Sequence, residues 1–315
     1  MMIRPFNFTD ADYESAISLR NQLYPDNPST VEIWKHNDKV RRRDPSYHFF
    51  LVESDAGELR AFVQFALNNP RSKKIAFGII AQNEAWHDGT ASSLMAAMAG
   101  ASRKLSAEKL VCKVQENDQP KVSYLEENGF ETVMRYPISA LTVASFDPTP
   151  FTSKIEETER LGIEVRQLPA GWQHDAKWQA LVHDLDWQLM LDVPSHEPRM
   201  QSPLEKFLTE EIFHPNSLTE SYFIAWDNDE AVGLTCFVKR GGRVETVSTL
   251  LTGVLQSHRR RGIARALKIE SIKFARNFGI QTILTNNEEN NPMFILNQQL
   301  GFQQKPAWIN LEKSL

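Results

Sequence analysis

Arg-Arg-Arg-Gly-Ile-Ala, residues 259–264, follows an apolar, β-branched run and precedes a segment with helical periodicity. The first run, residues 247–254, has the composition of a buried strand, and the second continues to Phe278. The first N–H groups of a helix have no partner inside the helix, and the helix dipole adds partial positive charge there. Gly262 and Ala264 carry no bulk beyond Cβ, so an anion can approach this backbone closely. The stretch therefore predicts a phosphate-binding loop, and its three arginines add attraction for a polyanion.

The loop fits neither G-x-x-x-x-G-K-[ST] nor G-x-G-x-x-G, since both patterns are absent from the chain. It resembles instead the Q/R-x-x-G-x-G/A loop of the GNAT N-acetyltransferase superfamily. A second family pattern, N-x-x-x-x-x-x-Y-x-x-x-G-F, resembles the segment from Asn290 to Phe302. The resemblance implies that acetyl-CoA binds as a co-substrate, with its pyrophosphate on the loop and its pantetheine arm along the strand that ends at Val254. The implied binding residues are Thr252, Gly253, Val254, Arg259, Arg260, Arg261, Gly262, Ile263, Ala264 and Asn290.

The same pattern occurs twice in the chain. Gly89 and Gly129 are separated by 40 residues, and Gly262 and Gly301 by 39. Upstream of each first glycine, two apolar runs are joined by a polar turn, as expected of paired strands. The chain thus resembles a tandem GNAT protein with two α/β domains of one fold. Each domain would have a mixed, largely antiparallel twisted sheet with a central splayed parallel strand pair and flanking helices.

A chain of 315 residues can form two domains of ordinary size. Two prolines in the segment Phe146–Pro150 interrupt regular structure, and a charged stretch follows as far as Arg160. We therefore expect an N-terminal domain over residues 1–147, a linker over 148–162 and a C-terminal domain over 163–315.

The two halves differ at the positions that would contact CoA. The N-terminal half has Trp86 and Asp88 in its loop, where an aspartate opposes a pyrophosphate, and Asp118 in register with Asn290. We therefore expect the C-terminal half to bind acyl-CoA and catalyse the reaction. The N-terminal half is interpreted as degenerate.

The resemblance implies that an amine attacks the thioester while a backbone N–H near Val254 stabilises the oxyanion. The position where the family often has a tyrosine acid holds Asn297, whose amide can donate a hydrogen bond. Glu245, at the start of the same strand as Val254, is either a base or an exposed strand-end carboxylate. His258, next to the loop, is expected to face solvent.

The acceptor is predicted to be an amine of a small molecule or a peptide. Residues 184–194 carry three carboxylates and a tryptophan. In the resembling family, this segment forms a wall of the acceptor site. This composition suits a cationic amine, and it equally suits an amphipathic helix with a solvated acidic face. Trp172, Trp178 and Trp187 are expected in the core.

The composition limits the kinds of partner, metal site and location that we expect. A net charge of −5 gives no support to a nucleic-acid partner. The two cysteines, Cys112 and Cys236, are expected to be buried thiols, and no Cys/His spacing indicates a metal. With no signal peptide or membrane-spanning run evident, we expect a cytoplasmic protein without a membrane partner. The oligomeric state stays open.

A second class of function remains from the sequence. Two GNAT-like domains could form a non-catalytic sensor or interaction protein that binds CoA without transfer. The absence of the tyrosine favours this alternative, and the intact loop together with Asn290 favours an enzyme.

Overall fold

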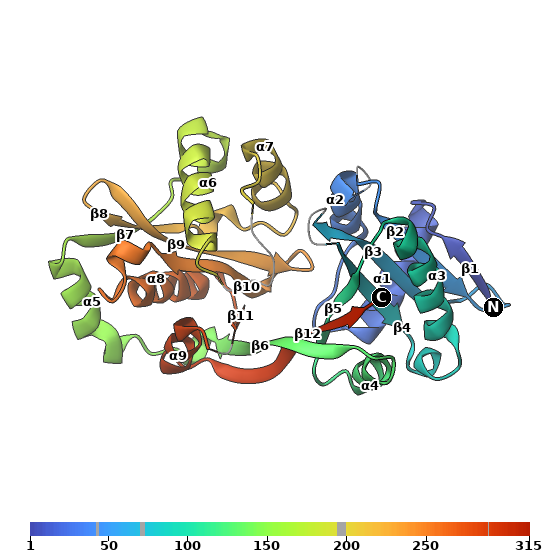
Figure 1. Ribbon diagram of the computed structural model, residues 1–315. Coiled ribbons are helices and arrows are strands. Elements are labelled where there is room, and N and C mark those ends of the chain that lie inside the picture. The colour runs from blue at the N-terminus through green and yellow to red at the C-terminus, as the bar shows by residue number, and fades with distance from the viewer. Residues whose placement is uncertain (42–43, 70–72, 194–199, 289) are drawn as a thin grey trace. The chain divides into compact units, whose positions relative to one another are not determined.

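The computed structural model describes residues 1–41, 44–69, 73–193, 200–288 and 290–315. These residues form two compact units, unit 1 comprising Met1–Pro137 with Pro306–Leu315 and unit 2 comprising Ile138–Lys305 (Figure 1). No helix in the described part of the chain is long and apolar enough to cross a membrane. Both cysteines are buried and free, as the sequence predicted.

The units do not coincide with the predicted segments 1–147 and 163–315, because each takes its last strand from the other half of the chain. Residues 138–142 of β6 (Glu131–Thr142) pair with β11 (Thr282–Asn286) inside unit 2. Residues 308–314 of β12 (Gln303–Ser314) pair with β5 (Lys109–Gln115) inside unit 1. Strand periodicity shows which face of a strand is buried but not which neighbour it joins, so the sequence could not show this exchange.

The predicted linker 148–162 is a folded part of unit 2. It contains η3 (Thr149–Phe151) and α5 (Thr152–Arg160), whose Ile155 packs against the core. The hydroxyl of Thr158 donates to the carbonyl of Arg261 at 3.2 Å. Pro150 lies in a first helical turn, where no N–H is needed, so it begins this structure rather than interrupting it.

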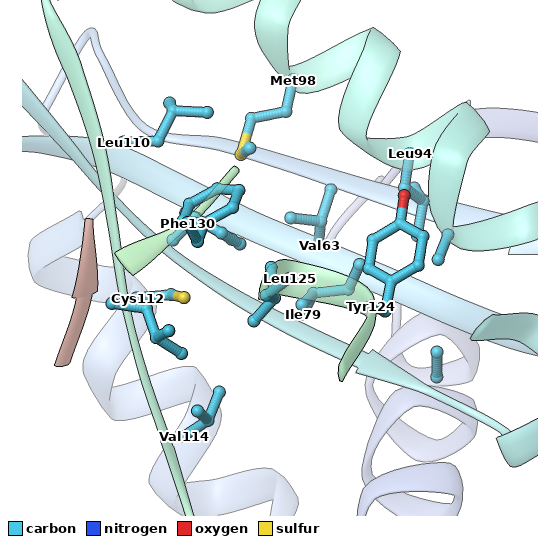
Figure 2. Close-up of a cluster of buried hydrophobic side chains, with 14 of the residues drawn as sticks. Val63, Ile79, Leu94, Met98, Leu110, Cys112, Val114, Tyr124, Leu125 and Phe130 are labelled. Atoms are coloured by element: carbon cyan, nitrogen blue, oxygen red, sulfur yellow. The ribbon is translucent and has the colours of Figure 1, made fainter. Parts of the chain in front are cut away.

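Unit 1 is a sheet in which β4 and β5 are parallel and the other neighbours, including β12 beside β5, are antiparallel. Its core lies between α3, α4 and the sheet and includes Leu94, Met98 and Leu125 (Figure 2). Its further elements are β1 (Met2–Pro5), α1 (Asp10–Leu23), α2 (Val31–Arg41), β2 (His48–Glu53), β3 (Leu59–Asn69), β4 (Lys74–Ala81), η1 (Asn83–Trp86), α3 (Thr90–Lys104) and α4 (Gln119–Glu127).

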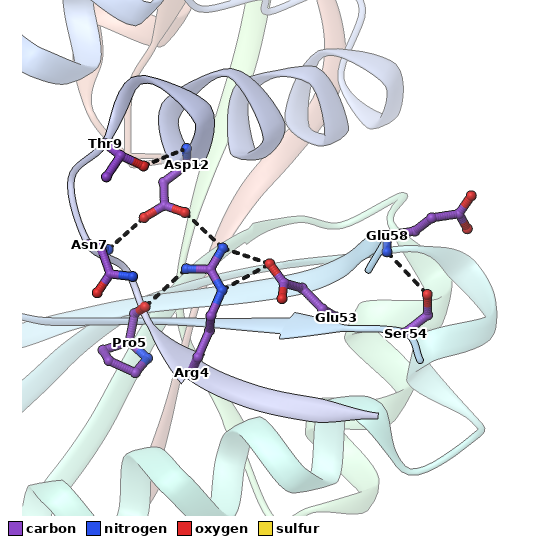
Figure 3. Close-up of polar contacts among 8 residues, drawn as sticks. All are labelled: Arg4, Pro5, Asn7, Thr9, Asp12, Glu53, Ser54 and Glu58. Atoms are coloured by element: carbon purple, nitrogen blue, oxygen red, sulfur yellow. Dashed lines mark hydrogen bonds and ion pairs between the residues drawn. The ribbon is translucent and has the colours of Figure 1, made fainter. Parts of the chain in front are cut away.

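A charged network fixes the start of unit 1 (Figure 3). Arg4 on β1 donates to Asp12 on α1 at 2.8 Å and to Glu53 on β2 at 2.6 Å. The second oxygen of Asp12 accepts the N–H of Asn7 at 2.6 Å. These carboxylates raise the pKa of Arg4 above its ordinary value. Because a charged group is stable in a partly buried place only when it is paired, the network joins the first strand and helix to the sheet.

Unit 2 repeats the fold, with strand order β6–β11–β10–β9–β8–β7. The helices α6 and α7 pack on one face of the sheet and α8 on the other (Figure 1). The remaining elements are η2 (Val143–Ser145), β7 (Ile163–Gln167), η4 (Trp172–His174), α6 (Ala176–Met190), α7 (Leu204–Phe207), the π-helical η5 (Leu208–Ile212), η6 (Thr219–Ser221), β8 (Phe223–Asp227), β9 (Glu230–Arg240), β10 (Arg243–Val254), η7 (Gln256–His258), α8 (Ile263–Phe278) and α9 (Pro292–Gln299). The predicted fold class is confirmed, including a parallel pair in each unit.

Candidate functional site

The parallel pair of unit 2 opens partway along its length. β10 and β11 pair from Thr246 opposite Thr282 as far as Ser248 opposite Leu284. β10 then continues to Val254, held on its other edge by β9. Beyond Ser248, the edge of β10 that faces β11 is outside the described pairing. Backbone groups along this edge are therefore available to an extended ligand, since each needs a hydrogen-bond partner.

A cleft of about 780 Å³ lies at this opening. Its walls come from the end of α6, the end of β10, the loop before α8, the first turn of α8 and the start of α9. Of the ten CoA-binding residues predicted from sequence, nine line this cleft: Thr252, Gly253, Val254, Arg259, Arg260, Gly262, Ile263, Ala264 and Asn290. The fold thus brings together two sequence patterns that lie some thirty residues apart.

The N-terminal end of α8 lines the cleft. Gly262 caps the helix in the left-handed region, with φ of 81°. Ile263 and Ala264 begin the helix without a capping side chain on Gly262, so their N–H groups face the cleft as free donors. Gly262 has a second role that the sequence did not reveal, because a Cβ here would collide with the hydroxyl of Thr158 on α5. Gly89, its counterpart in unit 1, has open space around it.

The three consecutive arginines make different contacts. Arg259 donates to the carbonyl of Val254 at 3.1 Å and pairs with Asp192, so it joins the end of β10 to the end of α6. Arg260 is exposed in the cleft, with a left-handed φ of 63°. Arg261 turns away and pairs with Asp227 at 2.7 Å. It is the one predicted binding residue that does not line the cleft, since Asp227 and the carbonyl of Leu161 hold its guanidinium.

Two basic side chains in the cleft were missed or misplaced by sequence reasoning. Arg265, in the first turn of α8, lines the cleft, and its buried Nε has no hydrogen-bond partner within the described residues. Its position three residues after Gly262 was the available signal, because side chains of a first helical turn lie beside the same end. His258 was expected to face solvent, yet its side chain is only 14% exposed and lies 3.5 Å from Asp227.

The second pattern closes the cleft from the other side. Asn290 hydrogen-bonds Glu288 through its side chain at 2.8 Å, and both residues line the cleft. The N-cap of α9 is Asn291, whose side chain accepts the N–H of Met293 at 2.9 Å. Asn290 therefore precedes the first residue of α9 by two positions.

The two candidate catalytic residues lie outside the cleft. Asn297 is a fully buried residue of α9, and its amide donates to Asn287 at 2.7 Å. Its other amide atom, Oδ1, is buried without a hydrogen-bond partner among the described residues, and a catalytic role for Asn297 stays a prediction. Glu245 is exposed at the opposite end of β10, roughly 20 Å from Thr252 at about 3.3 Å per residue. Its exposure fits a strand-end carboxylate, and a role as the base stays a prediction.

Asn297→Ala is expected to lower the melting temperature of the protein while leaving its acetyl-CoA affinity within a few-fold of wild type. Losing a partner inside a buried pair costs about 1–3 kcal/mol. Thermal unfolding and isothermal titration would measure both quantities, with Gln298→Ala, an exposed neighbour on α9, as the control. An unchanged melting temperature combined with slower turnover would return Asn297 to a catalytic role.

In unit 1, a side chain of the protein already bonds to the corresponding strand edge. The pairing of β4 with β5 extends to Phe77 opposite Cys112. Beyond it, the buried ammonium of Lys121 donates to the carbonyl of Ile79 at 2.8 Å. Lys121 follows Pro120 in α4 as Met293 follows Pro292 in α9. A backbone acceptor that could bind an extended ligand is thus already satisfied.

The helix end in unit 1 is also occupied. Asp88 accepts the N–H of Thr90, the first residue of α3, at 3.0 Å and pairs with Arg60 at 2.8 Å. The hydrogen bonds from Thr90, together with Arg60, lower the pKa of Asp88. A carboxylate of the protein therefore takes the place that an anionic ligand would need. Trp86 is buried, with its ring centroid 5.4 Å from that of Tyr124.

A family model described as the acetyltransferase (GNAT) family matches residues 12–130 and 178–302. The chain belongs to this family and contains two copies of its domain. Membership supports acyl transfer as the class of reaction. No curated protein matches the chain. Among the residues described, no cluster of His, Cys, Asp and Glu could hold a metal ion.

Solved structures share the tandem fold. A tandem GNAT protein from the clavulanic acid biosynthesis pathway superposes with a TM-score of 0.74 at 16% identity, covering 99% of this chain and 98% of that one. A GCN5-related N-acetyltransferase from Sphaerobacter thermophilus gives 0.68 at 17% identity, covering 99% and 95%. A glucosamine N-acetyltransferase region of a fungal β-N-acetylglucosaminidase gives 0.70 at 11%, covering 99% of this chain and 38% of that one. At these identities the likeness shows the fold alone.

Proposed function

We propose that the protein is an N-acetyltransferase that transfers acetyl from acetyl-CoA to an amine of a small molecule or peptide, and that unit 2 carries the reaction. The observation that supports this most is the cleft, because the open edge of β10, the first turn of α8 and four basic residues line it. An extended arm with a pyrophosphate at its end fits that combination.

A bulge in β10 supplies the oxyanion site of the proposal. The register with β9 shifts between Thr249 and Leu251, so Leu250 is an extra residue outside the regular ladder. A backbone N–H at such a position can donate to the carbonyl oxygen of a thioester as charge develops there. Most of the acceleration would then come from positioning and from this fixed dipole. A thiol with a pKa of about 8.5 is a good leaving group, so the thiolate needs no strong acid at position 297 to protonate it.

Unit 1 is proposed to serve as a scaffold without a CoA site of its own. Unit 2 presents an open strand edge and a free helix end to a ligand. In unit 1, Lys121 already bonds to the strand edge and Asp88 to the helix end. We therefore expect isothermal titration to give one acetyl-CoA per chain. Two equivalent sites would contradict the proposed difference between the units.

A CoA-binding sensor is the alternative, and the asparagine at position 297 in place of a tyrosine favours it. The two functions differ in thiol release. An acetyltransferase frees CoA thiol from acetyl-CoA when an amine is added, whereas a sensor binds acetyl-CoA with no release above the rate without protein.

A further inference from the structure

A second pocket, of about 310 Å³, lies in unit 2 between α6, the α7–η5 helix and β10. Leu250 and Leu251 of β10 line it, and the next three residues, Thr252 to Val254, line the CoA cleft. On α6, Asp186 and Met190 line the pocket while Leu189 lines the cleft, as does Asp192 just after the helix. The two hollows therefore share a strand and a helix, and they meet at the bulge where the proposed oxyanion donor lies.

The walls of this pocket combine apolar and acidic groups. The apolar lining comes from Trp187, Met190, Phe207 and Leu250. Trp187 is therefore a wall residue of the pocket and not the core residue expected from the sequence. Asp186, Glu210 and Glu211 add three carboxylates, and no lysine or arginine is among the described lining residues. Aromatic faces together with carboxylates attract an organic cation and repel an anion.

Glu211 is the carboxylate placed to exchange a proton. Burial raises its pKa to about 7, and the charges of Asp186 and Glu210 contribute in the same direction. Glu210, in contrast, has a cation beside it, since the ammonium of Lys206 lies 3.8 Å from its carboxylate. The other titratable groups near Glu211 are His183 on α6 and the buried Tyr222 and Cys236 beneath the pocket. A base whose pKa is close to 7 takes up and returns protons efficiently at neutral pH.

We propose that this pocket is the acceptor site, that it selects a primary amine on an aromatic or apolar body without a carboxylate, and that Glu211 removes the amine proton. This inference rests on the proposed function and names its substrate class. The ammonium passes one proton to Glu211, and the neutral nitrogen attacks the thioester carbon. The C–N bond forms and the C–S bond breaks, the second nitrogen proton ends on the thiolate, and Glu211 releases its proton to solvent.

The test uses the full chain, acetyl-CoA and two amines that differ by one carboxylate, 2-phenylethylamine and phenylalanine. We expect thiol release with 2-phenylethylamine at a kcat/KM at least tenfold above that with phenylalanine. With 2-phenylethylamine, Glu211→Gln should lower kcat/KM about 100-fold or more, as general bases contribute about 10²–10⁴. Wild-type activity should fall as the pH drops through about 7, and Glu211→Gln should lose this step.

Controls separate the possible failures. Acetyl-CoA affinity should be unchanged in Glu211→Gln, and Glu205→Gln, an exposed glutamate on α7, should behave as wild type. If Glu211→Gln misfolds, Asp186→Asn and the amine preference of the wild type still test the site. Transfer that prefers phenylalanine, or that is unaffected by Glu211→Gln, overturns this inference and leaves the acetyltransferase in place. Acetyl-CoA binding with no transfer to either amine overturns this inference, and no thiol release with any amine tried, small or peptide, overturns the acetyltransferase as well.

Discussion

Ala264→Glu is expected to weaken acetyl-CoA binding at least 100-fold without lowering the stability of the protein. Ala264 is the second residue of α8 and lines the cleft. A carboxylate in the first turn of a helix stabilises that helix by about 0.3–1 kcal/mol, because it interacts with the helix dipole. The same negative charge repels a pyrophosphate at the same N–H groups. The substitution therefore separates folding from binding, which a substitution of Gly262 cannot do because a Cβ there would collide with Thr158.

Ala264→Gln is the matched control, since it has nearly the same size and no charge. Isothermal titration should place its affinity within about tenfold of wild type, and thermal unfolding should show both variants folded. The difference between the two variants should shrink as salt is added, because ions screen the repulsion. Equal losses from both substitutions would mean that the position is blocked sterically and that the helix end does not bind phosphate.

Lys268→Met is expected to stabilise the protein most strongly below pH 7. Lys268 is buried in α8, with its ammonium 5.4 Å from the ring centre of Phe302, and burial lowers its pKa from 10.5 to about 7. Below pH 7 the folded state holds a buried charge. Between about 7 and 10.5 the unfolded chain binds more protons than the folded one, so wild-type stability rises with pH across that window. Methionine fills a similar space without a charge.

The gain at pH 6 should be on the order of 3 kcal/mol, since each unit of pKa shift corresponds to about 1.4 kcal/mol and local relaxation reduces the sum. The melting temperatures of wild type and Lys268→Met, measured from pH 6 to pH 10, would show the variant higher at pH 6 and the difference falling as the pH rises. Lys121 and the other buried groups are present in both proteins and cancel in the difference. A variant that melts lower than wild type at pH 6 would show that the ammonium stabilises the fold.

The sequence alone determined the local elements and the part of the site that depends on them. The β-branched run before Arg259 and the helical periodicity after Gly262 became β10 and α8, because hydrophobic spacing follows the geometry of each element. A helix end with small residues has the same chemistry wherever it lies. The loop, its repeat at Gly89 and the fold class could therefore be predicted before the tertiary structure.

The structure differs from the sequence-based predictions in the direction and partners of several polar side chains. Arg261 and Arg260 are neighbours in a run of identical residues, yet one pairs with Asp227 and the other faces the cleft. Asn297 has the spacing of a catalytic position but is bonded to Asn287. A partner distant in sequence decides each case, and periodicity carries no information about that partner.

Tertiary structure alone decided which strand completes each unit and where the second pocket lies. Residues 138–142 and 308–314 complete the sheets of opposite units, although nothing in their alternation distinguishes them from strands that return to their own sheet. Glu211 and Trp187 face one pocket because α6 and η5 pack side by side over β10. Packing between elements depends on shape summed over many distant residues, whereas the pattern within one element depends only on its own few residues.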